Sequence, residues 1–398
     1  MERLGTTQPG LKSRWCLAYE TIDRHDIDRL VEWLRSYPRL TKGPITAQFE
    51  ARWSQWLGCL HSIHCNSGSS ANLLMYYALL VSGRLRNKKV IVPSVGWVTS
   101  IAPAIQFGFE PVMCEADPET FGLDLNHLEA LLQRHEAQTV MLVQVLGVPH
   151  KMRELMALKS RYDFVLLEDA CAAIGASYEG RKVGSFGDIS SFSFYFGHQM
   201  STIEGGMVST NDKGLNDLLL MLRSHGWSKD LDRTTHGELV AQYGIDDFHS
   251  PFVFYEPGFN VRSTDLNAFL GIGQLEKLEW MTEQRRVNHA RYLERLAKSF
   301  YVQRPPSGSQ VASISVGLLA DSSQQRQRIV KALTGRGIET RIFSAGNLGL
   351  HPFWMKRYGV ASFPVADRIH HCGFFLPNHA ALTVEDIDII SHVVLEAA

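Results

Sequence analysis

Short apolar runs alternate with longer amphipathic stretches between residues 60 and 210. The apolar runs occupy residues 90–94, 139–145 and 164–170. Runs of this length are typical of strands that are buried on both faces of a mostly parallel sheet. The stretches with helical periodicity occupy residues 70–81, 125–134 and 152–161. This alternation predicts a three-layer α/β domain.

The pattern changes beyond residue 190. The predicted elements there are a strand pair at 191–196 and 205–210, a long helix at 266–296, a strand within 311–319 and a helix at 323–336. The last strand and helix are typical of a smaller α+β unit. We therefore expect two domains, a large one over residues 1–280 and a small C-terminal one over residues 281–398.

Composition and charge narrow the class of protein. The 398 residues are 45% hydrophobic and 20% charged, with a formal net charge of -1. This balance is typical of a soluble globular protein and argues against nucleic acid or an anionic membrane as the main partner. The basic pairs Lys88-Lys89 and Arg285-Arg286 are short, and we interpret them as parts of solvent-exposed faces. No apolar run approaches the roughly 20 residues that span a bilayer, and the N-terminus lacks a signal pattern, so we expect a cytoplasmic protein.

Six cysteines are scattered along the chain without a CxxC pair. In a reducing compartment such residues are more often buried small hydrophobes than disulfide partners. Metal and iron–sulfur sites usually show clustered thiolates, so we expect neither kind of site.

Two segments of the large domain carry candidate chemistry. Residues 66–72 are small and polar and precede a helix, where exposed N–H groups and the helix dipole can bind a phosphate. The alternative is an ordinary N-cap formed by Ser69 or Ser70. Asp169 ends a buried strand, where ligands of doubly wound sheets bind, and its carboxylate could pair with the pyridine nitrogen of a vitamin B6 cofactor. The alternative is a helix-capping aspartate.

His198 follows an aromatic strand and precedes a glycine-rich return at 205–206. A single histidine in such a place is usually structural. Its position after a strand end, like that of Asp169, favours a functional role.

Taken together, these segments resemble the DegT/DnrJ/StrS family of sugar aminotransferases, which are fold-type-I pyridoxal phosphate enzymes. The matching segments are Phe49-Glu50, 66–69, Pro93, Trp97, 108–112, Glu168-Asp169, 184–194, 204–206 and 258–262. The resemblance implies an aspartate-aminotransferase-like fold and a set of site roles. In it, Asp169 pairs with the pyridine nitrogen, Trp97 stacks on the ring, and the phosphate is bound by Gly68, Ser69 and Ser193. Asn260 would reach the phosphate of a neighbouring subunit, which implies a homodimer with a shared active site.

The chain departs from this family at residue 198. Ordinary members have a lysine there, whose primary amine tethers the cofactor, and an imidazole cannot do so. It can still act as base and acid, because its unperturbed pKa is about 6.5. Residues 194–198, 200–206, 222–227 and 257–270 are similar to family members that remove the C3 hydroxyl of a nucleotide-linked 4-keto-6-deoxyhexose. GDP-4-keto-6-deoxy-D-mannose, in deoxysugar (colitose) biosynthesis, is the substrate that the resemblance suggests first.

The implied reaction uses pyridoxal and pyridoxamine phosphate, with L-glutamate as amine source. His198 is the expected catalytic base and acid. A related class of dehydratases uses an iron–sulfur cluster, which the scattered cysteines disfavour. Two further functions remain open: an aminotransferase or B6-dependent deoxygenase acting on another keto sugar, and a non-catalytic cofactor-binding homologue.

Two points concern the substrate. The family usually has an acidic or amide side chain at the position of Ala172, for which Gln199 could compensate. His225, Arg262 and the insertion at 225–250 are candidates for reading the nucleotide sugar, and a solvent-exposed loop is the alternative for the insertion.

Overall fold

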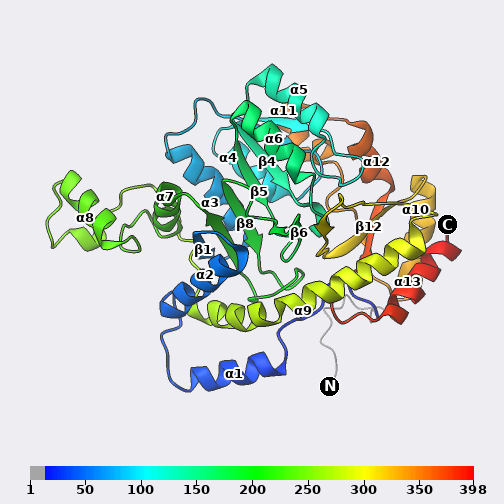
Figure 1. The fold of residues 1–398 in the computed structure, drawn as a ribbon, viewed down its shortest axis with the longest axis horizontal. Coiled ribbons are helices and arrows are strands. Elements are labelled where there is room, and N and C mark those ends of the chain that lie inside the picture. The colour runs from blue at the N-terminus through cyan, green and yellow to red at the C-terminus, as the bar shows by residue number, and fades with distance from the viewer. Residues whose placement is uncertain (1–13) are drawn as a thin grey trace.

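A seven-stranded sheet forms the centre of the computed structural model, which describes residues 14–398 (Figure 1). Its strand order is β1 (His61–Cys65), β9 (Gly206–Thr210), β8 (Ile189–Ser193), β5 (Val165–Asp169), β4 (Thr139–Val143), β2 (Lys89–Pro93) and β3 (Glu110–Cys114). Only β9 runs antiparallel to its neighbours in this sheet. The sheet confirms the expected mostly parallel α/β architecture.

Helices cover both faces of this sheet. The helices on one face are α3 (Gly68–Val81), α4 (Ala102–Gln106) and α7 (Lys213–Arg223). Those on the other are α2 (Pro44–Leu57), α5 (Leu125–His135), α6 (Met152–Tyr162) and the long α9 (Asp265–Leu296). Because side chains alternate along a strand, consecutive residues such as Ile91 and Val92 enter the two different cores. The expected three layers are therefore present.

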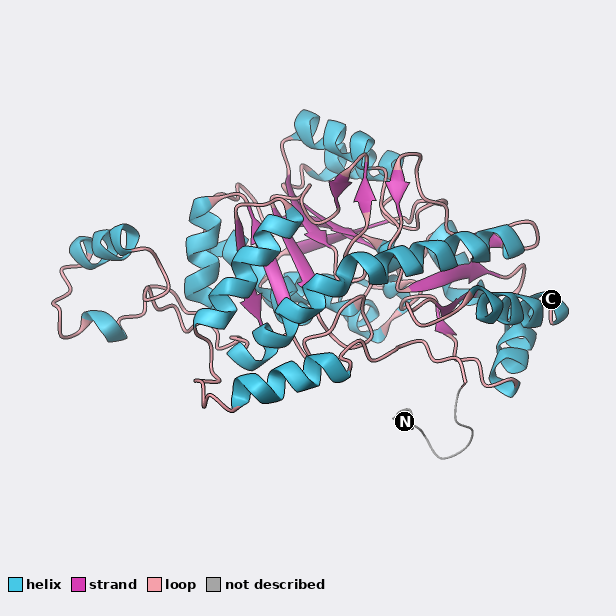
Figure 2. Ribbon diagram, turned by 60° about the horizontal axis from the view of Figure 1, so that its bottom comes forward, coloured by secondary structure: helices cyan, strands magenta, loops and turns pink. Residues whose placement is uncertain are grey.

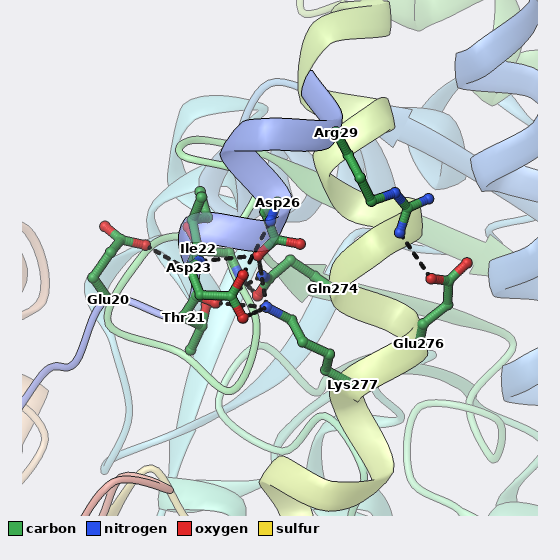
Figure 3. Close-up of polar contacts among 10 residues, drawn as sticks. Glu20, Thr21, Ile22, Asp23, Asp26, Arg29, Gln274, Glu276 and Lys277 are labelled. Atoms are coloured by element: carbon green, nitrogen blue, oxygen red, sulfur yellow. Dashed lines mark hydrogen bonds and ion pairs between the residues drawn. The ribbon is translucent and has the colours of Figure 1, made fainter. Parts of the chain in front are cut away.

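The 32-residue helix α9 leads from the large sheet to a second one (Figure 2). It begins at the N-cap Thr264, whose hydroxyl accepts a hydrogen bond from the backbone of Asn267. The N-terminal helix α1 (Arg24–Leu34) is fastened to α9 through a buried carboxylate (Figure 3). Asp26 accepts hydrogen bonds from Gln274 Nε2 at 2.8 Å and from Lys277 Nζ at 2.6 Å.

The second sheet is antiparallel and lies near the C-terminus. Its strand order is β10 (Tyr301–Val302), β12 (Ser315–Leu319), β14 (Gly373–Pro377) and β13 (Arg341–Ile342). The remaining helices of this region are α10 (Ser323–Gly335), α11 (Pro352–Tyr358), α12 (Pro364–Cys372) and α13 (Val384–Glu396). Trp15, far away in sequence, lies in the same core and donates its indole N–H to Asp386. The domain boundary at residue 280 remains a prediction, and α9 continues across it.

A third, small sheet joins the two regions. It consists of β11 (Ser309–Gln310), β6 (Ser177–Tyr178) and β7 (Arg181–Lys182). In it, β11, which follows α9, pairs with β6, which follows β5. The third sheet therefore links the C-terminal region to the chain just beyond Asp169.

The segment between α7 and α9 projects from the body (Figure 1). We call residues 231–254 the arm; it carries α8 (Arg233–Gln242), in which no residue is buried. Several large aromatic side chains of the arm are exposed, among them Phe248 (86%) and Phe252 (72%). The insertion at 225–250 is therefore largely solvent-exposed in a single chain.

Candidate active site

The carboxyl end of β5 places Asp169 in a buried pocket of hydrogen-bond donors. Its Oδ2 accepts from Ser100 Oγ at 2.6 Å and from Asn72 Nδ2 at 2.9 Å, and its Oδ1 accepts from the backbone N–H of Cys171. Asn72 is itself oriented by Ser191, whose hydroxyl donates to its Oδ1 at 2.6 Å. The carboxylate is thus fixed at a strand end rather than used as a helix cap.

The neighbouring Glu168 points to the opposite face, as expected for consecutive strand residues. It is fully buried and accepts hydrogen bonds from the backbone N–H groups of Gly184, Phe186 and Gly187 and from the Gln144 amide. Burial raises its pKa. Glu168 therefore organises the loop before β8, and Asp169 remains the carboxylate of the site.

The start of α3 lies directly against the end of β8. A Cβ atom on Gly68 would lie 2.5 Å from Ser193 Cβ, so only glycine fits there. The N-cap is Ser67, which accepts from the backbone of Ser70, so the alternative of a cap at Ser69 or Ser70 is wrong. Ser69 is exposed and takes no part in the N-cap hydrogen bond. The helix N-terminus, Ser69 and Ser193 together form a cradle with the chemistry that a phosphate requires.

Trp97 lies beside this pocket and is 59% exposed. It is the N-cap of a single 3-10 turn (Val98–Ser100) whose last residue, Ser100, donates to Asp169. The expectation that Trp97 stacks on a ring held by Asp169 remains a prediction, and the short turn places both residues on one segment.

His198 lies in a turn that follows β8. Its backbone N–H donates to the carbonyl of Tyr195 at 2.9 Å, and its Nδ1 is buried without a hydrogen-bond partner among the described residues. Burial lowers the pKa of His198 to about 4; Asp169 acts in the opposite direction, and Arg285 adds to the lowering. The imidazole is therefore neutral near pH 7 and able to accept a proton.

Two neighbours of this turn have roles that differ from the sequence-based expectation. Gln199 is fully buried, and its amide nitrogen donates to the carbonyls of Ala172 and Ala312, both at 2.6 Å. Gln199 therefore fixes the backbone carbonyl of residue 172. The expectation was that its side chain would replace the acidic or amide group that Ala172 lacks. Arg285 is also buried, at 2% exposure, so its assignment to a solvated face is wrong.

The lysines nearest to His198 in sequence are engaged elsewhere. Lys213 pairs with Asp217 at 2.5 Å, Lys182 lies over the ring of Trp56, and Lys229 lies 3.7 Å from the ring centroid of Trp227. Each of these amines has its own partner, away from Asp169.

A second group of candidate residues lies at the base of the arm. Arg262 donates to Asn260 Oδ1 at 3.0 Å and lies 3.5 Å from His225 Nε2. His225 stacks edge-on against Trp227, with ring centroids 4.8 Å apart. Asn260 is exposed. In the described part of the chain this group makes no side-chain hydrogen bond to Asp169, Ser193 or His198.

Sequence reasoning did not identify Asn72, Ser100 or Arg285 as parts of the site. Arg285 could have been found: the buried residues of α9 recur at helical spacing through Leu278, Met281, Arg285 and Tyr292. The contacts of Asn72 and Ser100 join segments far apart in sequence and leave no comparable periodic signal.

Comparison with known proteins identifies the family of this chain. A model of the DegT/DnrJ/EryC1/StrS aminotransferase family matches residues 20–395. The chain belongs to this family. It is 32% identical over 371 residues to a GDP-4-keto-6-deoxy-D-mannose 3-dehydratase of Yersinia pseudotuberculosis, covering 91% of this chain and 93% of that protein.

Members with a different activity are similarly close. A GDP-perosamine synthase of Caulobacter vibrioides is 29% identical, covering 94% of this chain and 96% of that protein. Among solved structures, a GDP-4-keto-6-deoxymannose-3-dehydratase with a trapped PLP-glutamate geminal diamine superposes with a TM-score of 0.88. It is 27% identical and covers 96% of this chain and 100% of that one.

The family assignment confirms the fold class and the cofactor. Members have the fold-type-I architecture and depend on pyridoxal phosphate, and the donor set around Asp169 and the cradle at Gly68 fit that group. The protein is a pyridoxal phosphate-dependent, sugar-modifying enzyme. Within residues 14–398, no helix is long and apolar enough to cross a membrane.

Proposed function

We propose that this enzyme is a glutamate-dependent 3-dehydratase of a nucleotide-linked 4-keto-6-deoxyhexose, with GDP-4-keto-6-deoxy-D-mannose as first candidate. The observation that carries the proposal is an imidazole at position 198, in the turn where lysine-bearing relatives would tether the cofactor. The similarity to proteins named GDP-4-keto-6-deoxy-D-mannose 3-dehydratase also supports the proposal.

The cofactor, aminated by glutamate, would supply a carrier for the sugar's C4 carbonyl and an electron sink. Asp169 would hold the ring nitrogen in its protonated form. Gly68, Ser69 and Ser193 would hold the phosphate, and Trp97 would cover the ring face.

His198 moves the proton that dehydration needs. Because burial keeps its pKa at about 4, the imidazole is unprotonated near pH 7 and available as the base. For the same reason its protonated form is a stronger acid than an ordinary imidazolium. Hydroxide is a poor leaving group, so His198 then donates this proton to the departing C3 hydroxyl.

The net reaction balances without another reductant. The sugar loses one oxygen atom at C3, and glutamate leaves as 2-oxoglutarate and ammonia, so glutamate is the electron donor. No nitrogen stays on the sugar.

The test is an incubation of purified protein with pyridoxal phosphate, L-glutamate and GDP-4-keto-6-deoxy-D-mannose. The expected products are ammonia, 2-oxoglutarate and a sugar one oxygen atom lighter. A product that retains the glutamate nitrogen would identify an aminotransferase instead. Absence of 2-oxoglutarate with this and related keto sugars would point to a non-catalytic homologue.

An aminotransferase activity is the second candidate. The similarity to GDP-perosamine synthase favours it. Against it stands the engagement of the nearest lysines away from the site.

We further propose that the active enzyme is a homodimer with shared sites. Asn260 is exposed and held by Arg262, and the aromatic arm lacks cover from its own chain. In this arrangement Asn260 reaches the cofactor phosphate of the other subunit. His225 and Arg262 supply donors and a positive charge for the nucleotide diphosphate of the substrate.

A further inference from the structure

Arg285 and Arg286 are adjacent on α9 but have opposite surroundings. Arg286 is half exposed and pairs with the carboxylate of Glu283 one turn away. Arg285 is buried on the side of α9 that faces the site. No carboxylate lies within ion-pair distance of its guanidinium in residues 14–398.

The partners of Arg285 are backbone carbonyls from two parts of the molecule. One terminal nitrogen donates to the carbonyl of His198 at 3.1 Å. The other donates to the carbonyl of Asn378, directly after β14, and lies 3.5 Å from that of Ser313, before β12. A single guanidinium therefore bridges the His198 turn and the second sheet.

The bridge is reinforced from the side of the second sheet. Asn378 donates to the carbonyl of Arg285 and to Ser313 Oγ, and Ser313 is in turn hydrogen-bonded to His289 Nδ1 at 2.9 Å. These residues are all buried. The guanidinium is thus held firmly on one side while it holds the His198 carbonyl on the other.

Burying a cation without a counter-charge is unfavourable, and carbonyl dipoles offset only part of that cost. Bridging both sets of carbonyls needs the fork of terminal nitrogens that arginine has and lysine lacks. The bridge therefore also places a positive charge at the His198 turn.

We propose that Arg285 is the positioning residue of the His198 turn: it fastens the His198 carbonyl to the second sheet and presents a positive charge to the imidazole. The catalytic meaning of this role rests on the proposed function, whereas its effect on His198 does not.

The charge acts on His198 against a carboxylate on another element. Asp169 at the end of β5 raises the pKa of His198, and Arg285 on α9 lowers it. Tyr195 lies in the same turn, with its ring centroid 6.3 Å from that of His198. Burial is the largest cause of the lowered His198 pKa, and Arg285 adds to that lowering against the opposing effect of Asp169.

The test compares Arg285→Met, which removes the charge, with Arg285→Lys, which keeps it but lacks the fork that spans both sets of carbonyls. Arg286→Met is the matched control on the same helix. The first readout is the pKa of His198 by NMR of histidine-labelled holoenzyme, assigned by the signal lost in His198→Asn. The second is the pH profile of kcat/KM.

We expect Arg285→Met to raise the pKa of His198 and to move the acidic limb of the profile upward by the same amount. Arg285→Lys should leave that pKa near the wild-type value while kcat falls and KM changes little. Arg286→Met should change neither. An unchanged His198 pKa in folded Arg285→Met overturns the proposal. It is also overturned if Arg285→Lys raises the His198 pKa while it lowers the stability of the protein, because the pKa change would then follow from disrupted packing.

If Arg285→Met does not fold, Arg285→Gln takes its place, because it keeps two donors without the charge. The NMR readout is independent of the sugar reaction. An enzyme that proves to be an aminotransferase can therefore still confirm or contradict the effect of Arg285 on His198.

Discussion

The His198 turn and the base of the arm both carry residues assigned to the active site, but the turn and the arm are stabilised in opposite ways. The turn is held by side chains of its own chain: Arg285 binds the His198 carbonyl, and Gln274 accepts from the backbone of Ser201. Both come from α9, which also anchors α1 (Figure 3). The arm has no buried residue in its helix and exposes Phe248 and Phe252.

This difference distinguishes the parts of the active site that one chain forms alone from the parts for which it needs a second subunit. The turn, Asp169 and the cradle at Gly68 come from one subunit. Asn260, His225 and Arg262 lie together at the base of the arm, where Asn260 is exposed. We therefore assign proton transfer and most of the cofactor binding to one chain, and completion of the phosphate and nucleotide sites to a dimer.

The largest expected effect comes from replacing the catalytic group in the turn. His198→Lys should lower the dehydration rate by at least about 100-fold, the range of a lost general acid–base. The measurement is the rate of ammonia release with glutamate and the keto sugar. His392→Lys, an exposed histidine on α13 paired with Glu396, is the control. Dehydration at the wild-type rate in His198→Lys would show that another group moves the proton.

A smaller effect is expected from the arm. Phe248→Asp and Phe252→Asp together should weaken subunit association by about 2 kcal/mol or more, a typical value for a buried aromatic anchor, which is about 30-fold in Kd. Light scattering over a concentration series measures it. Tyr37→Asp, at a position that is 94% exposed on another part of the surface, is the matched control. An unchanged dimer, or a wild-type protein that is monomeric at all concentrations, would remove the shared-site proposal.

The smallest effect of a single substitution, about 1.4 kcal/mol per pH unit, concerns the pH dependence of stability. Burial lowers the pKa of His64 to about 3 and that of His289 to about 4, from 6.5. The unfolded chain therefore binds more protons than the folded one as pH falls from 6.5 towards 4. Stability should be full above pH 6.5 and decline through that window, by about 1.4 kcal/mol per pH unit for each such histidine.

Urea unfolding at several pH values measures this decline. His289→Gln should make it shallower by one proton, whereas His249→Gln on the exposed arm should not change it. Equal slopes for the wild type and His289→Gln would mean that His289 titrates normally in the folded protein.

The sequence was informative where the structural signal is local. The apolar runs at 139–145 and 164–170 are found as β4 and β5, and the periodic stretch at 266–296 is found as α9. The order of residues shows the strand end at Asp169 and the small, polar segment 66–72 before a helix, whereas the roles predicted for Asp169 and Gly68 came from the family resemblance. The prediction of a strand over residues 191–196 was less accurate, because β8 ends at Ser193 and the chain then turns away.

What the sequence left hidden depends on tertiary contacts. Arg285-Arg286 is typical of a surface pair, and only the packing of α9 shows that the first arginine is inside. Similarly, Ser100 and Asn72 meet at Asp169 from separate segments. For the insertion at 225–250 the sequence left a substrate-reading segment and a solvent-exposed loop as alternatives, and the structure shows exposure in a single chain.

The central claim is that the cofactor is held without a covalent bond to the protein. Borohydride reduction of the holoenzyme, followed by intact-mass analysis and peptide mapping, tests this claim directly. The account predicts unmodified protein and release of all cofactor on denaturation. A pyridoxyl group fixed to any lysine would contradict it.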